Sequence, residues 1–278
     1  MNDSENNGDI HYKNATKELN KFSWWFGPSQ EEKECKAMDE YVKAGDQYKL
    51  AQCYDKAGDA YQQVADLYYK HAEYYYAAGF YVQSAEMYKN IDKMLTEAML
   101  SNAIKLYHQI GNFSNAGKYT EMLIEVRNDS NLSFKLNKYL DALHYYEASN
   151  LKYPIIHCLD KMYYIAVQLG QYEQAIVFLN KICSLCTKYY EYSKHYQSIL
   201  VLKLVLGDIV DCRKTLNSHM KEPNYIHQPE YQFCNDLLDA YENNNVDDFM
   251  ETLKRNKIPW QHDLLMMIAN RFHEDDLC

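Results

Sequence analysis

The most regular pattern of hydrophobic and polar positions in this chain spans nine residues. It reads Gly or Asn, any residue, an aromatic residue, two more residues, Ala, two more residues and a second aromatic residue. Copies begin at positions 111, 137 and 170, and a looser copy with Cys212 in the Ala position begins at 207. The Gly or Asn predicts a helix end, because these residues tolerate the left-handed C-cap conformation. The Ala predicts close helix approach, and the aromatic side chains are expected to fill the groove between helix pairs.

The spacing of these copies indicates stacked helical hairpins. Successive copies are separated by 26, 33 and 37 residues, and a period of about 34 residues with this content is typical of tetratricopeptide-type repeats. We therefore predict an all-α fold, a right-handed tetratricopeptide-like solenoid of helical hairpins that ends in a C-terminal helical bundle.

Apolar residues at three- and four-residue steps predict helices over most of the chain. Gly45 and Gly79 are predicted to separate helices, and Ser29, followed by Glu31 and Glu32, is predicted to cap the first helix of the array. The predicted helices are 31–44, 48–63, 66–78, 80–91, 93–110, 113–126, 132–136, 139–148, 154–169, 172–188, 190–206, 210–220, 229–242, 246–255 and 259–272.

The pattern divides the chain into four parts. Residues 1–20 are polar and charged and are predicted to be disordered, and 21–30 form an aromatic loop. Residues 31–221 form the hairpin array. The last part, 222–278, lacks the repeat and is predicted to form a cap bundle with an acidic tip.

Composition narrows the class of protein. The 28 Tyr, 9 Gly and 5 Pro among 278 residues fit an array of thin helix pairs. A formal charge of −10 argues against nucleic acid as the main partner, because phosphate binding needs a dominant basic surface. The chain shows no apolar signal segment and no apolar run long enough to span a membrane. Its eight scattered Cys predict a cytoplasmic protein in a reducing compartment.

The sequence offers no active site. Cys183 and Cys186 form a Cys-x-x-Cys pair, a spacing that binds zinc or exchanges disulfides in other contexts. Zinc would need two further ligands, and a redox site would sit beside a βαβ unit, neither of which the sequence provides. The pair is interpreted as small core-filling side chains, and no catalytic residue, metal or cofactor is predicted.

The aromatic loop admits two interpretations. Phe22, Trp24, Trp25 and Phe26 fall within five residues, and Gly27-Pro28 follows them. The cluster either packs back onto the first helices as a strap or forms an exposed anchor. Trp favours the membrane–water interface, and a single loop of this kind would bind a membrane weakly and reversibly.

These features together resemble the soluble NSF-attachment protein family, the alpha type in particular. The resemblance rests on the Phe-Ser-x-x-Phe-Gly-x-Ser loop, the helical array, the cap segment Leu237–Phe249 and the ending Glu274–Cys278. It extends from about residue 20 to the end.

The resemblance implies a non-enzymatic adaptor that binds the four-helix SNARE complex, syntaxin-like members included, and recruits the hexameric ATPase NSF. It implies membrane contact through Phe22, Trp24, Trp25 and Phe26, so that the protein would be peripherally membrane-associated. It implies contact with NSF through Asp275, Asp276 and Leu277, the last stimulating the ATPase. The SNARE-facing positions of the family fall on Asn112, Lys118, His157 and Lys161.

Two of these positions depart from the family. Asn112 stands where the family has Arg, and His157 stands where it has a basic residue. SNARE bundles are acidic, so these departures are expected either to weaken binding or to suit a divergent bundle. The loss of two exposed ion pairs, each worth only about 0–1 kcal/mol, need not abolish binding. The alternatives are a generic tetratricopeptide-like scaffold for another partner and an enzyme that uses Cys183 and Cys186.

Overall fold

The described part of the chain consists of helices and the short turns that join them. The computed structural model describes residues 3–22, 27–128, 130–186, 189–220, 228–255 and 258–275. No strand occurs within these ranges, and the predicted all-α fold is confirmed. The chain forms two compact units, Met1–Leu151 and Lys152–Cys278.

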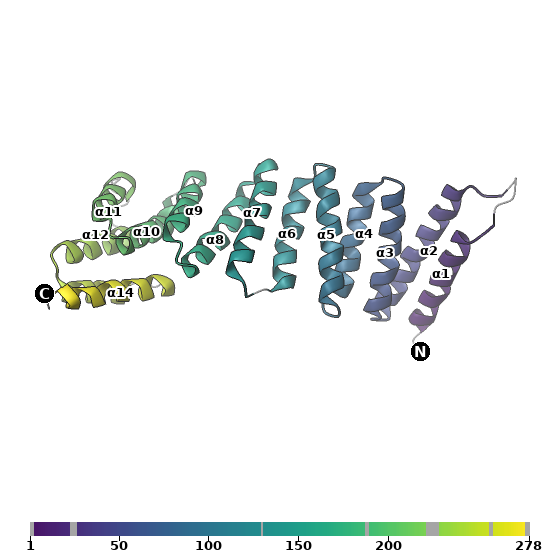
Figure 1. Ribbon diagram of the computed structural model, residues 1–278, viewed down its shortest axis with the longest axis horizontal. Coiled ribbons are helices and arrows are strands. Elements are labelled where there is room, and N and C mark those ends of the chain that lie inside the picture. Colours follow the sequence, from purple (N-terminus) through teal and green to yellow (C-terminus); the bar gives the residue numbers. More distant parts are fainter. Residues whose placement is uncertain are drawn as a thin grey trace. The chain divides into compact units, whose positions relative to one another are not determined.

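The first unit is a row of helices in which each packs mainly against its neighbours in sequence, as Figure 1 shows. This nearest-neighbour packing is the arrangement of a repeat protein. Its helices are α1 (Asp3–Leu19), α2 (Gln30–Leu50), α3 (Tyr54–Lys70), α4 (Tyr74–Tyr88), α5 (Lys93–Gln109), α6 (Phe113–Arg127) and α7 (Leu132–Ala148).

Left-handed residues occupy four of the turns between these helices, at Gln52, Ala72, Gly111 and Asn128. Gly111 has a φ of 74°, which confirms the helix end predicted there. Gln52 and Ala72 adopt the same conformation, with φ values of 60° and 58°, without being Gly or Asn. Gly111 follows Ala72 by 39 residues, and Asn150 follows Gly111 by 39. A repeat of two helices in this unit therefore spans 39 residues, which is more than the predicted period of about 34.

The predicted disorder at the N-terminus is wrong for Asp3–Leu19, which form α1. This helix has few large apolar residues, and it packs through small ones: Gly8 and Ala15 are buried. The ring of Tyr12 lies edge-on to that of Tyr41, with centroids 5.0 Å apart. Contacts with α2 therefore stabilise a helix that its own hydrophobic pattern does not predict.

The helices predicted over 48–63 and 66–78 are wrong, because the turns fall at 51–53 and 71–73. Two predicted helix ends and the break predicted after 136 are also wrong. Gly45 lies inside α2, where its lack of a side chain makes room for the ring of Tyr61. Gly79 lies inside α4, because one Gly costs a helix only about 1 kcal/mol. Residues 132–148 form one helix rather than two, since Leu136 and Leu143 are both buried on the same side of α7.

The predicted seams between helices are confirmed. Ala116 and Ala142, the Ala positions of the first two copies of the pattern, are fully buried. The aromatic residues lie between neighbouring helices: the rings of Tyr107 and Tyr119 stack at 5.6 Å, and those of Phe113 and Tyr145 at 6.4 Å. Small residues thus allow close approach, and aromatic rings fill the remaining space.

The second unit begins as antiparallel helices and continues as a bundle around α10. Within it α9 packs on α8 and α10, and α10 in turn contacts α11, α12 and α14. Its elements are α8 (Lys152–Gln168), α9 (Tyr172–Leu185), α10 (Tyr189–Val205), α11 (Ile209–Thr215), the π-helical turn η1 (Leu216–Met220), α12 (Pro229–Glu242), α13 (Val246–Lys254) and α14 (Pro259–Asp275).

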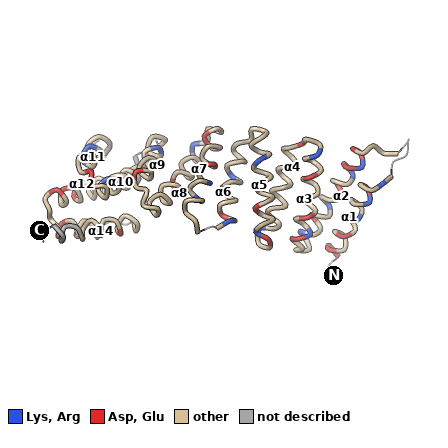
Figure 2. Tube along the Cα trace, in the orientation of Figure 1, with Lys and Arg blue, Asp and Glu red and all other residues tan. Residues whose placement is uncertain are grey.

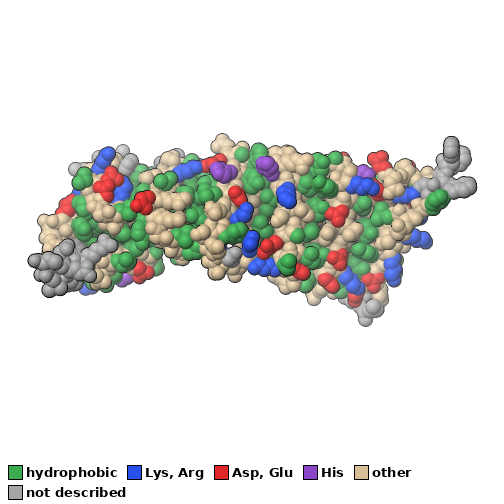
Figure 3. Space-filling view, viewed as in Figure 1, with side chains coloured by type: hydrophobic (Ala, Val, Ile, Leu, Met, Phe, Trp, Pro, Cys, Tyr) green, Lys and Arg blue, Asp and Glu red, His purple; other side chains and the backbone are tan. Residues whose placement is uncertain are grey.

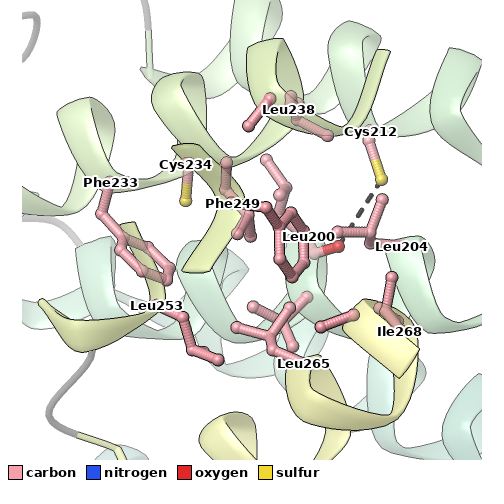
Figure 4. Packing of buried hydrophobic residues seen from close by; sticks show 14 of the residues in the cluster. Leu200, Leu204, Cys212, Phe233, Cys234, Leu238, Phe249, Leu253, Leu265 and Ile268 are labelled. Carbon is pink, nitrogen blue, oxygen red and sulfur yellow. Dashed lines mark hydrogen bonds between the residues drawn. The ribbon is translucent and has the colours of Figure 1, made fainter. Parts of the chain in front are cut away.

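A single apolar core holds this bundle together (Figure 4). The ring of Phe249 from α13 is fully buried between Leu200 of α10, Leu238 of α12 and Leu265 of α14. Cys212 donates a hydrogen bond to the Leu200 carbonyl oxygen, at 3.5 Å. Burying a side chain as large as that of Phe249 stabilises the folded state by about 1.5–3 kcal/mol.

One buried polar group joins α10 to α14. Gln261, which is fully buried, accepts a hydrogen bond from Gln197 at 2.7 Å and donates one to Ser198 at 2.9 Å. These partners fix the register of the two helices, because a buried amide left unpaired would be costly. Among the described helices, none has the length and apolar character needed to cross a lipid bilayer.

Candidate partner-binding surfaces

The junction between α1 and α2 carries the aromatic loop. The side chain of Phe22 is 84% exposed. This exposure does not fit a strap in which Phe22 packs back onto the first helices. Trp24, Trp25 and Phe26 lie outside the described residues.

Both ends of this loop are held by hydrogen bonds. The ammonium group of Lys33, a buried residue, donates to the backbone carbonyl oxygen of Lys21. On the other side, Ser29 caps α2: its hydroxyl accepts from the Glu32 N–H, and the Glu32 carboxylate accepts from the Ser29 N–H. The predicted cap is confirmed. Because α2 fixes both ends, Phe22 is presented on a short, anchored connection.

A buried carboxylate links the start of α2 to the turn between α3 and α4. Glu34 is buried and lies 2.5 Å from the Lys70 ammonium and 2.8 Å from His71 Nε2. The hydrogen bond from Lys70 is the main cause that lowers the pKa of Glu34 below its usual range. Sequence reasoning did not pair these residues, since 36 positions separate Glu34 from Lys70.

Asn112 and Lys118 lie in the first two turns of α6. The Asn112 carboxamide oxygen accepts a hydrogen bond from the Asn115 N–H at 3.3 Å and so caps the helix. Lys118 is exposed, and its ammonium lies 5.2 Å from the ring centroid of Tyr119. Asn112 thus has a structural task at a position where the family carries a cation, whereas Lys118 presents its charge to solvent.

His157 and Lys161 are separated by four residues on α8 and are both exposed. Residues at this spacing share one face of a helix. The face they share lies in the second unit, whereas Asn112 and Lys118 belong to the first.

The acidic tip follows the last helix. α14 extends to Asp275. The side chain of Asp275 and all of Asp276 and Leu277 lie outside the described residues.

The cysteine pair has the character of core packing. Cys183 is buried, and this burial raises the pKa of its thiol to about 12. A reactive thiol requires the opposite shift. Among the described residues, no group of three His, Cys, Asp or Glu side chains could hold a metal ion.

Acidic and basic side chains are interspersed along the described helices and do not form separate patches. Basic and acidic residues alternate along α1, α2 and α3 (Figure 2). Hydrophobic side chains occupy much of the face of α3 to α6 that Figure 3 presents, with single charges scattered among them. Tyr69, Tyr75 and Tyr76 at the turn between α3 and α4 are also exposed, and the run Tyr74-Tyr75-Tyr76 is the sequence signal that could have revealed them.

The fold defines the class: stacked helical hairpins in the first unit and a helical bundle in the second. In the sequence, an aromatic segment lies between α1 and α2, and an acidic segment ends the chain. The sequence model described as "Soluble NSF attachment protein, SNAP" matches residues 6–271. The chain belongs to the soluble NSF attachment protein family.

One named relative and two solved structures are similar to this chain. The chain is 27% identical over 186 residues to a probable vesicular-fusion protein sec17 homolog from Neurospora crassa, a match that covers 63% of this chain and 64% of the relative. BtubC (BKLC) from P. vanneervenii is similar in structure at 12% identity and a TM-score of 0.30, covering 89% of this chain and 92% of that one. Aspartyl phosphate phosphatase F from Bacillus subtilis has 12% identity and a TM-score of 0.32, covering 96% and 70%.

Proposed function

We propose that this protein is a non-enzymatic adaptor that binds SNARE complexes and recruits NSF in vesicle fusion and intracellular protein transport. The observation that carries the proposal is the match of the attachment-protein model across residues 6–271. It includes the helical array, the loop after α1 and almost all of α14. In this role the protein performs no chemistry: it grips the SNARE bundle, and the ATPase works on the bundle through it.

The SNARE-binding surface would include Lys118 on α6 and His157 and Lys161 on α8. The exposed ammonium groups of Lys118 and Lys161 would meet the acidic surface of the bundle. Each exposed pair contributes only about 0–1 kcal/mol, so their main effect would be on the association rate and its salt dependence. Asn112, already used as a helix cap, would contribute shape rather than charge.

The two ends of the chain would supply the other contacts. Phe22, with Trp24, Trp25 and Phe26, would insert into the membrane interface and place the protein as a peripheral membrane protein. Asp275 and Asp276 would face a basic surface of NSF, and Leu277 would stimulate its ATPase activity.

The decisive experiment is assembly from purified parts. The protein is mixed at low salt with an immobilised SNARE four-helix bundle that includes a syntaxin-like member, and NSF is then added. We expect a ternary complex and ATP-dependent disassembly of the bundle. Absence of a complex at low salt would contradict the adaptor role and would favour a scaffold for another partner.

Charge reversal tests the proposed SNARE surface. Lys118→Glu combined with Lys161→Glu should lower affinity for the bundle by roughly 10-fold, because each reversal replaces attraction by repulsion. Lys89→Glu is the matched control, since Lys89 is exposed at the opposite edge of the first unit, where α4 ends. An equal loss in both variants would mean that overall charge, and not this surface, governs binding.

The acidic tip has its own readout. Leu277→Ala should leave SNARE binding unchanged and reduce the stimulation of NSF ATPase activity by the adaptor–SNARE complex. A generic scaffold would show no such separation between binding and stimulation.

A further inference from the structure

Two groups of tyrosines in the first unit differ in what their hydroxyls do. In the first group the hydroxyl donates to a carboxylate, as in Tyr61 to Asp46 at 2.7 Å. In the second group the hydroxyl makes no hydrogen bond within the described part of the chain. The second group includes Tyr69, Tyr75 and Tyr76, which are 53%, 57% and 54% exposed.

Within the second group, five residues surround the turn between α3 and α4. We call Tyr68, Tyr69, Tyr74, Tyr75 and Tyr76 the tyrosine turn. Their rings support one another: Tyr68 stacks on Tyr76 at 5.3 Å, Tyr69 lies 5.7 Å from Tyr74, and Tyr75 meets Tyr76 edge-on at 5.8 Å. The exposed rings are therefore held in place before any partner arrives, which lowers the entropic cost of binding.

The tyrosine turn lies on the same edge of the first unit as the aromatic loop. Figure 1 shows that α1 ends, α2 begins and α3 passes into α4 at this edge. The contacts agree, because Glu34, four residues into α2, holds both Lys70 and His71 of the turn. Phe22 and the exposed tyrosines are thus joined through one rigid set of contacts.

A hollow beside Tyr69 adds polar groups to this surface. It has a volume of about 310 Å³ and is lined by Tyr69, Tyr81, Asn102, Lys105, Leu106 and Gln109. The exposed Lys105 has no acidic partner within the described residues. Exposed aromatic rings next to a free ammonium group suit a phospholipid surface, where rings enter the interface and a cation meets the phosphates.

The charges around the turn explain why a bilayer fits better than an acidic protein surface. Lys70 and His71 face the carboxylate of Glu34, and the exposed Glu73 and Lys105 carry opposite charges. The patch is therefore close to neutral and mainly aromatic. Tyr, like Trp, is enriched at membrane–water interfaces because its ring is apolar and its hydroxyl remains hydrated.

We propose that the tyrosine turn is a second membrane-contact surface, which binds the phospholipid interface together with the aromatic loop. This inference rests on the proposed membrane contact of that loop and extends it to α3 and α4. Two weak contacts on one rigid body bind more tightly than either alone, because the first raises the effective concentration of the second. The loop alone would give only reversible attachment.

The test measures partition of the full chain onto liposomes. The variant Tyr69→Ser/Tyr75→Ser/Tyr76→Ser is sedimented with phosphatidylcholine vesicles, with and without phosphatidylserine. We expect a roughly 10- to 100-fold lower partition coefficient on both kinds of vesicle. Thermal unfolding checks that the variant is folded.

A matched control removes apolar side chains from the opposite edge. Leu50, Ile91 and Met94 are 70%, 54% and 82% exposed at the turns that follow α2 and α4. Their triple Ser variant should partition like the unchanged protein. Conversely, Tyr75→Trp should increase partition, and thermal unfolding checks that this variant is folded as well.

The outcomes separate this inference from the adaptor role. If the tyrosine variant binds vesicles like the unchanged protein, while Phe22→Ser/Trp24→Ser/Trp25→Ser/Phe26→Ser abolishes binding, the second surface does not exist. If the tyrosine variant retains vesicle binding and loses the SNARE bundle, the surface binds protein and the inference is wrong. The adaptor role is tested without membranes, by formation of the ternary complex. Success or failure of that assay does not affect the interpretation of the vesicle measurement.

Discussion

The ring of Tyr61 lies so close to Gly45 that a Cβ atom on Gly45 would come within 2.7 Å of Tyr61 Cε1. The same relationship recurs in the first unit, where Gly8 meets Tyr48, Gly58 meets Tyr88 and Gly117 meets Tyr146. In the pairs of Gly8, Gly45 and Gly58, the residue after the Gly is an Asp that accepts the Tyr hydroxyl. A Gly-Asp step on one helix thus forms a socket for a Tyr of its neighbour.

The first prediction concerns the Gly of this socket. Gly45→Ala should lower the free energy of unfolding by roughly 1–2 kcal/mol, although Ala is the better helix former by about 1 kcal/mol. The ring cannot easily give way, because Tyr61 is buried and its hydroxyl is tied to Asp46. Denaturant unfolding measures the change.

Gly79 provides the control for this prediction. It also lies inside a helix, α4, but a Cβ atom there would meet nothing within 4 Å. Gly79→Ala should therefore stabilise the protein by up to about 1 kcal/mol. If both variants were stabilised, the socket would not constrain the packing.

The second prediction concerns the hydroxyl. Tyr61→Phe keeps the ring and removes the hydrogen bond to Asp46, which should cost roughly 0.5–1.5 kcal/mol of unfolding free energy. Tyr75→Phe, whose hydroxyl has no partner among the described residues, should cost close to nothing. Equal stability of the two variants would show that the hydroxyl bond is not a net contributor.

The Gly–Tyr sockets also show why some parts of the fold can be predicted from the sequence and others cannot. The hairpin pattern located most helices, because apolar periodicity and buried Ala residues such as Ala116 and Ala142 repeat along the chain. Gly45 and Gly79 were wrongly predicted as helix ends, since a Gly that makes room for a ring and a Gly that ends a helix look alike in sequence. The left-handed turn residue Gln52 gives no such signal, since its conformation is imposed by the packing of α2 on α3.

The candidate binding surfaces likewise contain some residues that the sequence predicts and others that it does not. Phe22 is marked by a local run of aromatic residues and Lys118 by the family resemblance, and both are exposed. The link from Glu34 to Lys70 could not be predicted, because long-range packing creates it. Helix α1 was missed because its buried face consists of Gly8 and Ala15, which carry almost no hydrophobic signal.

The third prediction is a loss of stability at alkaline pH. Burial, followed by the hydrogen bond to its Asp, raises the pKa of Tyr61 and likewise of Tyr48, Tyr81 and Tyr88. A raised folded-state pKa means that the stabilisation is complete below the unfolded-state pKa of about 10 and is lost as pH rises beyond it. The unfolding free energy should therefore fall steadily above about pH 10.

Denaturant unfolding at pH 8 and at pH 11 measures this loss. The variant Tyr61→Phe should show a shallower fall than the unchanged protein, because it has one such group fewer. A fall of identical steepness would mean that other groups account for the alkaline sensitivity.

The fourth prediction concerns the attachment of α1 at acid pH. The hydrogen bond from His11, followed by that from Lys43, lowers the pKa of Glu40 from 4.5 to about 2. Glu40 therefore contributes stability above pH 4.5, and this contribution, up to about 3 kcal/mol, is lost as pH falls toward 2. The protection factors of the α1 amides, which are corrected for the intrinsic pH dependence of hydrogen exchange, should fall over this range.

Two variants define the contribution of Glu40. Glu40→Gln should weaken α1 at pH 6 and make little difference below pH 2, where most of the Glu40 carboxylate is protonated. Asp39→Asn is the control, since Asp39 is exposed and has no ion pair within the described residues. Acid sensitivity that persists unchanged in Glu40→Gln would assign the effect to another group.

The last prediction separates an adaptor from a thiol enzyme. Burial raises the pKa of Cys183 to about 12, so at pH 8 only about one molecule in 10⁴ carries the reactive thiolate. Iodoacetamide should label the exposed Cys35 quickly and leave Cys183 unmodified until the protein unfolds, which mass spectrometry of peptides can follow. The variant Cys35→Ser should abolish the fast labelling at that position without making Cys183 faster. Rapid labelling of Cys183 in the native protein, or stoichiometric bound zinc, would instead support the enzymatic alternative, because both require a thiolate that the packing of α9 disfavours.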